Sequence, residues 1–326
     1  MSKSRRGGRG TFVAIAAVLA AGAAYPLILP RSLNFGFSVV LFAALATAWD
    51  LIGGWAGQLS LGHAAFIGLG AYVSTLLWTK AGLGLSVGLP LAIASGVLLA
   101  LAWGFITFRL RGAYFSLASI AVAEVLRILA NNWSSLTGGP EGVSFNDLPP
   151  LFGLDLFDRR VEYYGALLLL AAALLIAFRV GGSRAGFYLE AVREDQDSSM
   201  ALGVDPLRMK LIAFSLSAAL TTAGGCLYAI YLSFFEPHGV FALDLSVQLV
   251  LMSIVGGMGT VLGPLLGALV LLAFQEAFRN VFQQSSLLIY GVLIVLIVRY
   301  SPDGLSGRLQ LLLRRIPWPL RSRSAR

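Results

Sequence analysis

The chain has 326 residues, of which 57% are hydrophobic and only 12% are charged, so charged side chains are too few to cover a soluble protein of this length. The net charge of +8 is concentrated at the two ends of the chain, which is typical of a helical membrane protein and does not indicate nucleic-acid binding. The single cysteine, Cys226, excludes a disulfide within the chain.

This composition predicts an all-α, polytopic helical membrane protein. We expect a basic cytoplasmic N-terminus at residues 1–10, a membrane domain at residues 11–300 and a basic cytoplasmic tail at residues 301–326. The basic start and the apolar run after it could also be a signal peptide cleaved near Ala24, but we favour an uncleaved first span.

Apolar runs predict about ten membrane spans, with both termini in the cytoplasm. The expected spans are 11–29, 33–52, a glycine-broken span from 53 to about 78, 85–108, 113–131, 163–179, 211–231, two spans within 245–278, and 287–298. Spans two to three and eight to nine could instead be re-entrant. The acidic, turn-rich segment 133–162 is then an outer loop, and the segment 181–210, which we call the charged loop, is cytoplasmic.

The charged loop is the one long charge-rich segment between apolar spans. Each of its charges would cost about 2.5–3.5 kcal/mol at the centre of a bilayer, so the loop lies outside the hydrocarbon. Leu189 and Val192 recur at helical spacing, which predicts a structured, amphipathic element. Such an element either docks on another molecule or is a solvated connector between two spans.

Two glycine-rich stretches interrupt the spans in opposite halves of the chain, and transporters often place broken helices in corresponding positions of two repeats. These broken-helix glycines are Gly53, Gly54, Gly57 and Gly62 in the first stretch, and Gly256, Gly257, Gly259 and Gly263 in the second. Because glycine is common in all membrane helices, ordinary close packing is the alternative explanation.

The sequence lacks the motifs of a phosphate-binding loop, a zinc protease, a CxxC redox pair and a serine hydrolase. Its two histidines, His63 and His238, cannot form an ordinary zinc site with one cysteine. We therefore expect no catalytic residue, no metal and no cofactor. His63, at an expected helix start, is interpreted as a packing or capping residue in preference to a proton carrier.

One ion pair is expected within a span, because Glu124 and Arg127 are three residues apart and share a helix face. A charged pair inside a membrane is a candidate functional site, and the alternative, which we favour, is a structural clamp between helices. Weaker signals near span ends are Asp50, Asp244, Gln248 and Glu276. No series of buried acids is found that would couple transport to protons or sodium, which argues against a secondary transporter.

Four blocks of the sequence carry a resemblance to a known family: Trp49–Leu77, Arg111–Val143, Glu190–Leu220 and Gly256–Ala268. Together they resemble the branched-chain amino-acid ABC permeases of the LivM/LivH family. They occur in the family's order and cover most of the chain. Departures from the family pattern are Thr221-Thr222, where small or apolar residues are expected, and Val143-Ser144-Phe145 after the outer glycine turn.

The resemblance implies an ABC importer permease in the plasma (inner) membrane of a prokaryote. Its implied partners are a homologous LivH-like permease, two ABC ATPase subunits, an extracytoplasmic substrate-binding protein and membrane lipid. Branched-chain or related hydrophobic amino acids are the implied substrate, with urea or short amides as the alternative within the family. A stand-alone secondary transporter or channel is the alternative from another class.

The resemblance also implies a cytoplasmic coupling helix, carried over to residues 190–202, with residues 203–210 leading into the next span. The implied ATPase-coupling residues are Glu190, Arg193, Glu194, Asp195, Ala201, Leu202 and Gly203. ATP hydrolysis is expected in the partner subunits, so this chain is not expected to be an enzyme.

Overall fold

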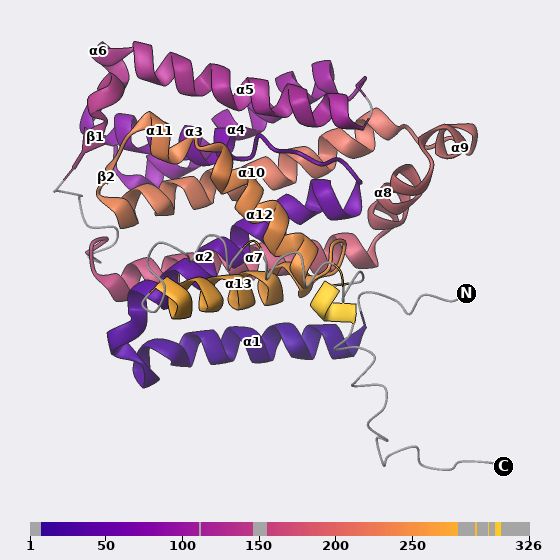
Figure 1. Cartoon of the computed structure of the whole chain (residues 1–326), viewed down its shortest axis with the longest axis horizontal. Helices are drawn as coiled ribbons and strands as arrows, with labels where there is room; N and C mark the ends of the chain where they lie inside the picture. Colours follow the sequence, from indigo (N-terminus) through magenta and orange to yellow (C-terminus); the bar gives the residue numbers. More distant parts are fainter. Residues whose placement is uncertain are drawn as a thin grey trace.

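The computed structural model describes residues 8–110, 112–145, 155–279, 291, 299 and 304–307. These residues form a bundle of helices whose axes run mostly along one direction, with short elements at both ends (Figure 1). The long helices are α1 (Arg9–Ile28), α2 (Leu33–Asp50), α3 (Ala64–Thr79), α4 (Leu85–Thr107), α5 (Ala113–Asn132), α7 (Arg159–Gly182), α10 (Pro206–Leu232), α12 (Leu243–Gly256) and α13 (Gly263–Arg279).

Short elements join these helices. They are α6 (Ser134–Thr137), α8 (Arg184–Glu194), α9 (Gln196–Ala201) and α11 (Pro237–Val240), the 3-10 turns η1 (Pro30–Ser32) and η3 (Gly139–Glu141), the π-helical turn η2 (Leu51–Trp55), and the strands β1 (Val143–Ser144) and β2 (Phe234–Phe235). The two strands pair antiparallel, with Val143 opposite Phe235 and Ser144 opposite Phe234.

The predicted all-helical membrane fold is confirmed. The described residues contain 7 helices long and apolar enough to cross a membrane, and two shorter apolar helices, Ala64–Thr79 and Gly263–Phe278. The expected count of about ten spans is therefore not reached within the described residues. The expected span 287–298 lies largely outside them.

α2 lies at the centre of the bundle and packs against α7, α10, α12 and α13. Small residues such as Ala44, Ala46 and Ala48 are fully buried along it and let neighbouring helices approach closely. α1 packs against α7 at the edge, and most of its surface is left open. Buried small residues therefore distinguish the central helix, although α1 and α2 are similarly apolar.

α3 and α10 approach through glycines. A methyl group on Gly70 would lie 2.1 Å from the carbonyl oxygen of Thr222, and one on Gly225 would lie 2.2 Å from that of Ile67. The unusual Thr222 is accommodated because glycine stands at position 96 of α4, where a methyl group would meet its hydroxyl at 2.1 Å. The threonine side chain at this position is thus matched by a glycine on α4.

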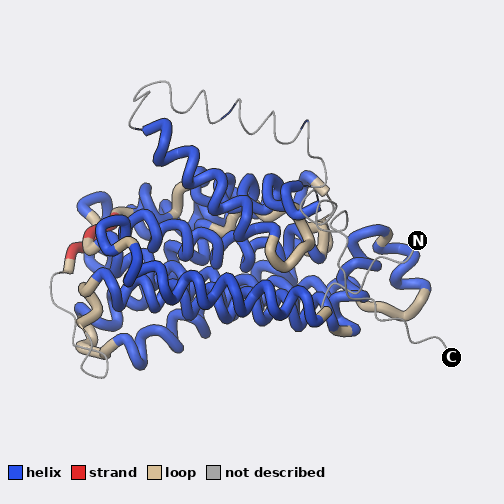
Figure 2. Tube along the Cα trace, turned by 90° about the horizontal axis from the view of Figure 1, so that it is seen from below, coloured by secondary structure: helices blue, strands red, loops and turns tan. Residues whose placement is uncertain are grey.

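The two ends of the bundle differ. One end, which we call the hairpin end, carries α6, α11 and the paired strands; the other, the loop end, carries α8, α9 and the start of α1 (Figure 1; Figure 2 shows the strands at one end of the bundle). The segments expected outside and inside the cell therefore lie at opposite ends. Which end faces the cytoplasm stays a prediction at this point.

Candidate functional site

The first helix break follows α2. The chain widens into the π-helical turn η2 at Leu51–Trp55, leaves the helix over residues 56–63 and resumes as α3. Residues 51–63 together are what we call the first break. Gly57 within it has a φ of +70°, a conformation that favours glycine. A non-helical stretch inside a membrane domain needs partners for its backbone groups.

Neighbouring helices supply those partners. Serines of α5 and α12 and a tryptophan of α2 bond to the first break or to the start of α3. The bonds run from Ser116 Oγ to Leu59 O at 2.7 Å, from Leu61 N to Ser119 Oγ at 2.8 Å, from Ala64 N to Ser246 Oγ at 2.8 Å, and from Trp49 Nε1 to Ser60 O at 2.7 Å.

His63 adds a link between the first break and α10. Its imidazole is fully buried, with Nδ1 2.9 Å from Ser60 Oγ and Nε2 2.8 Å from Ser217 Oγ. Both ring nitrogens therefore have hydrogen-bond partners within the protein. His63 therefore fastens the first break to α10.

The second helix break, residues 257–262, separates α12 from α13. Gly257 and Gly259 have φ angles of 117° and 67°. Thr260 stabilises this turn, because its hydroxyl donates to Gly257 O at 2.7 Å and accepts from Gly263 N at 3.1 Å. A methyl group on Gly256 would lie 1.8 Å from Gly263 O, so the ends of the two helices are in backbone contact.

The two breaks meet in space. The buried carboxylate of Asp50, at the end of α2, accepts a hydrogen bond from Gly259 N at 3.0 Å. A methyl group on Gly54 would lie 2.4 Å from that same nitrogen. Two glycine stretches of opposite halves of the chain thus form one contact, in which Asp50 and two backbones take part.

Arg193 of α8 reaches this contact from the charged loop. Its Nη1 donates to Gly54 O at 2.7 Å, and a methyl group on Gly259 would lie 3.1 Å from that nitrogen. Its aliphatic part lies on Gly57, where a methyl group would meet Arg193 Cγ at 2.4 Å. Arg193 therefore contacts both breaks.

The expected single helix over residues 190–202 is wrong, because the structure divides it into α8 and α9. Asp195 is extended, with φ −153° and ψ 114°, and its carboxylate accepts from Asp197 N at 2.9 Å and Ser198 N at 3.0 Å. An aspartate in this conformation caps a new helix and does not continue the old one. α9 therefore begins at Gln196 and turns away from α8.

The inner face of the charged loop is anchored to the bundle. Leu189 and Val192 are the buried apolar side chains on the inner face of α8. The buried ammonium of Lys210, near the start of α10, donates to Gln196 Oε1 of α9 at 2.9 Å. Ser183 and Asp205 cap α8 and α10 through their side chains. These contacts give α8 and α9 fixed positions on the loop end.

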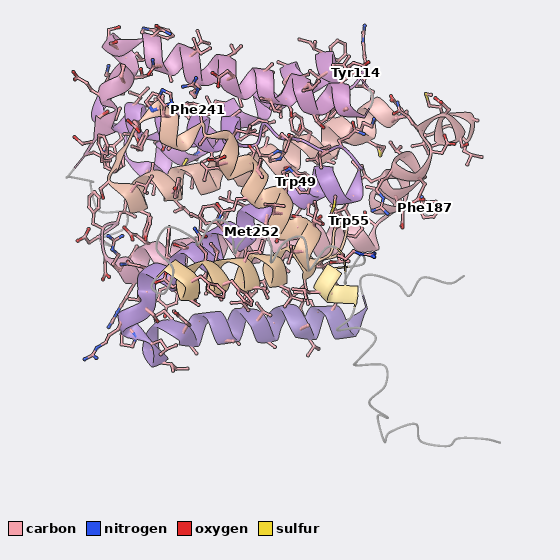
Figure 3. The ribbon with its side chains drawn as sticks, viewed as in Figure 1. Trp49, Trp55, Tyr114, Phe187, Phe241 and Met252 are labelled. Atoms are coloured by element: carbon pink, nitrogen blue, oxygen red, sulfur yellow. The ribbon has the colours of Figure 1, made fainter. Side chains whose placement is uncertain are left out.

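The outer face of the loop is exposed and partly apolar. Leu202 is 84% exposed and Phe187 is 71% exposed, and Phe187 projects from α8 at the end of the bundle (Figure 3). Tyr188 and Met200 are also exposed. Large apolar side chains on a charged, water-facing segment are typical of an interaction surface.

The seven predicted coupling residues fall on different sides of the loop. Arg193 faces the breaks, Glu190 is half-buried, and Glu194, Asp195, Ala201, Leu202 and Gly203 are exposed. Sequence reasoning missed Phe187, Tyr188 and the roles of Asp50 and Lys210. For Phe187 the signal was readable, since it is an apolar residue in the charged loop outside the helical stripe of Leu189 and Val192.

Glu124 and Arg127 lie together, but far from the loop end. Arg127 Nε donates to Glu124 Oε2 at 2.8 Å, and Arg127 Nη1 is 2.9 Å from Nδ1 of His238 on α11. α11 lies at the hairpin end, so this cluster and the charged loop occupy opposite ends of the bundle (Figure 1). Arg127 thereby joins α5 to α11.

A family model described as the branched-chain amino acid transport system / permease component matches residues 31–298. The chain is 32% identical over 317 residues to the high-affinity branched-chain amino acid transport system permease protein LivM of Salmonella typhimurium, covering 89% of this chain and 73% of that protein. It is also 32% identical over 319 residues to LivM of Escherichia coli, covering 89% of this chain and 74% of that protein.

The second permease of the same transport system is more distant. LivH of Escherichia coli is 23% identical over 287 residues, which cover 82% of this chain and 91% of LivH. No solved structure matches the chain. The similarity is therefore higher to the proteins called LivM than to this one called LivH.

Proposed function

The chain belongs to the family of branched-chain amino acid transport system permease components. We propose that it forms one half of the membrane path of an ABC importer. The importer is driven by ATPase subunits that dock on α8 and α9. A homologous, LivH-like permease forms the other half. Two ABC ATPases supply the energy, and an extracytoplasmic binding protein delivers the substrate.

The observation that carries this proposal is the contact of Arg193 with both helix breaks. ATP binding closes the ATPase pair and shifts the docked α8 and α9. Because Arg193 Nη1 holds Gly54 O at 2.7 Å, the shift reaches the first break directly. Through Asp50 and Gly259 it reaches the second break, so helices of both halves of the chain move together.

A contact between the ATPase and this chain is required if ATP binding is to change which side of the path is open. A nucleotide can change which side of the path is open only if it binds the two states with different affinity. The nucleotide site is on another subunit, so the difference must pass through the docking contact. A solvated connector, the alternative for the charged loop, would not need a guanidinium seated between two breaks.

The exposed face of α5 is the surface we assign to the second permease and the path. Tyr114, Leu117 and Ile128 are exposed along it, and Glu124 lies in the same stripe. An ion pair facing lipid is costly, by about 2.5–3.5 kcal/mol for a single charge on the mild insertion scale. A neighbouring protein surface or a water-filled path is a better environment for Glu124 and Arg127.

The substrate follows from the names of the relatives, which are branched-chain amino acid permeases. We propose branched-chain or related hydrophobic amino acids, with urea or short amides as the alternative. Competition for uptake separates these two: leucine should inhibit the uptake of labelled isoleucine by the assembled importer, and urea should not.

The loop end is assigned to the cytoplasm, because the ATPases act there. The start of α1 lies at the same end, in line with a cytoplasmic N-terminus (Figure 1). The protein is a multi-pass protein of the inner membrane. A cysteine-specific, membrane-impermeant reagent applied to whole cells should leave a cysteine at position 202 unlabelled, whereas a labelled cysteine would reverse the orientation.

The test of the function is purification of the tagged chain from its native membrane, with identification of what co-purifies. A second permease and ATPase subunits are expected. If the chain purifies alone and moves solute in liposomes under an ion gradient, it is a stand-alone transporter and the charged loop is a connector.

A further inference from the structure

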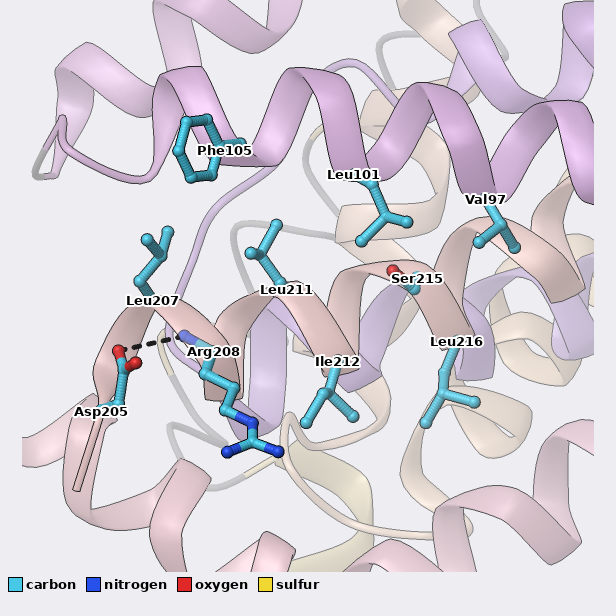
Figure 4. Close-up of a pocket in the computed structure, with 10 residues that line it drawn as sticks. All are labelled: Val97, Leu101, Phe105, Asp205, Leu207, Arg208, Leu211, Ile212, Ser215 and Leu216. Atoms are coloured by element: carbon cyan, nitrogen blue, oxygen red, sulfur yellow. Dashed lines mark hydrogen bonds between the residues drawn. The ribbon is translucent and has the colours of Figure 1, made fainter.

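A groove runs along the outside of the bundle between α4 and α10, with a volume of about 650 Å³. Its wall consists of three rows of side chains, and the residues within each row are four apart in the sequence. One row is on α4 (Val97, Leu101 and Phe105), and two are on α10 (Leu207, Leu211 and Ser215; Arg208, Ile212 and Leu216) (Figure 4). Residues four apart lie above one another on a helix, so the groove follows the helix axes for about 12 Å.

The wall is apolar and open to the outside. Leu101, Phe105 and Ile212 are all exposed, at 42%, 54% and 43%. Because the helices cross the membrane, a groove along their axes is parallel to the acyl chains of the surrounding lipid. Apart from Ser215, the polar residues of the wall, Asp205 and Arg208, are at the end where α10 begins.

Two arginines stand at that end. Arg208 is part of the wall, and the guanidinium carbon of Arg109 lies 5.7 Å from the centre of the Phe105 ring. Within the described residues, neither arginine forms a salt bridge. The nearby Asp205 carboxylate accepts from Arg208 N at 3.2 Å and so caps α10. The mouth of the groove therefore has an excess of positive charge.

We propose that this groove binds an anionic phospholipid, with an acyl chain between α4 and α10 and the phosphate between Arg109 and Arg208. The direction of the groove fits a lipid chain, and the charge at its mouth fits an anionic headgroup, since basic residues at a membrane surface attract anionic lipid. The inference needs only the membrane-spanning fold. It is independent of ATPase docking.

The test uses the chain in its native complex, reconstituted into bilayers of equal parts phosphatidylglycerol and phosphatidylcholine. In parallel samples, a trace of one or the other lipid carries a photoreactive acyl chain, and labelled peptides are identified by mass spectrometry. We expect peptides containing 97–105 and 207–216 to be labelled at least fivefold more by phosphatidylglycerol. High salt should reduce this ratio.

The variant Arg208→Gln should lower the labelling ratio about fivefold, the equivalent of about 1 kcal/mol for one basic residue at an anionic surface. Arg208 N and its bond to Asp205 remain in this variant, so α10 keeps its cap. Arg109→Gln, which changes a residue outside the wall, should lower the ratio too and provides a second test of the same site. Arg179→Gln is the matched control, because Arg179 is an exposed arginine in the last turn of α7.

Three results would overturn the proposal. Equal labelling by the two lipids would mean that the groove holds ordinary bulk lipid. An unchanged ratio in both arginine variants would place the anionic preference elsewhere. Absence of lipid labelling, together with cross-links from the groove to a second permease, would make the groove a protein interface. Failure of ATPase docking would change none of these outcomes.

Discussion

The inner and outer faces of the charged loop differ in what holds them. On the inner face, Leu189 is buried and Arg193 contacts both helix breaks. On the outer face, Phe187 and Leu202 project with most of their surface exposed. One face is fixed to the membrane domain, and the other is exposed. In the proposed complex the exposed face binds the ATPase, and the fixed face passes its movement to the helices beneath.

Arg193 and Glu194 are adjacent, and both were predicted to be ATPase-coupling residues, but they differ in which face of the loop they occupy. The side chain of Arg193 is 28% exposed and directed at the breaks, whereas that of Glu194 is 68% exposed. Changes on the inner face should impair stability or the coupling of ATP hydrolysis to transport. Changes on the outer face should impair ATPase binding and leave the fold intact.

The largest effect is expected for Gly54→Ala, at the contact of the two breaks. The new methyl group would lie 2.1 Å from Asp50 Oδ1 and 2.4 Å from Gly259 N. We expect a destabilisation of about 3 kcal/mol, the upper end of overpacking costs, with loss of uptake. The thermal stability of the purified variant measures it. Gly182→Ala is the control, because nothing lies within 4 Å of a methyl group there; equal stability of the two variants would contradict the contact.

The next effect is expected for Arg193→Ala, which removes the link between α8 and the breaks. It leaves the carbonyl of the buried Gly54 without this donor, at a cost of about 1–3 kcal/mol. We expect at least a tenfold lower uptake, with ATPase subunits still co-purifying and ATP hydrolysis retained. Uptake and hydrolysis are measured in the same liposomes. Normal uptake per ATP hydrolysed would show that the link is not used.

Leu202→Asp, on the outer face, should reduce transport less than Arg193→Ala does, but it should weaken assembly with the ATPase more. If Leu202 is an interface anchor, its loss costs about 2 kcal/mol, or about 30-fold in ATPase affinity. Thermal stability of the permease should not change, because Leu202 is 84% exposed. Titration of the ATPase onto the reconstituted permease measures the affinity. Leu202→Ala should fall between the wild type and the aspartate variant, and unaltered affinity in both would remove Leu202 from the interface.

The smallest effect is expected for Asp195→Ala, which removes the cap of α9. Loss of an aspartate cap costs about 1 kcal/mol, so amide exchange within 196–201 should become about fivefold faster. Asp195→Asn should restore the slow exchange, because asparagine caps as well as aspartate. If the asparagine variant exchanges as fast as the alanine variant, Asp195 acts through its charge and not as a cap.

Local features of the site were predictable from sequence, and long-range ones were not. The pair of Glu124 and Arg127 could be predicted, because the two residues are three apart on a helix. The contact of Asp50 with Gly259 joins residues 209 apart, and no periodicity indicates it. Arg127 and His238 are 111 residues apart and were equally hidden.

The division of the charged loop into α8 and α9 was predictable in part. Asp195 precedes a short polar run, which is a known start signal for a helix, yet the helical spacing of Leu189 and Val192 favoured one continuous helix. The family resemblance implied a docking role for this segment, but it also implied one continuous helix over residues 190–202. Only the extended backbone at Asp195 shows where the chain turns.

ATPase docking on the outer face of α8 and α9 is tested most directly by a cysteine at position 202, in a chain whose buried Cys226 is replaced by serine, with cross-linking in the assembled complex. We expect a cross-link to the ATPase subunit, with a yield that changes when ATP binds. A position 202 that never cross-links to the ATPase, while a cysteine at the hairpin end does, would contradict it.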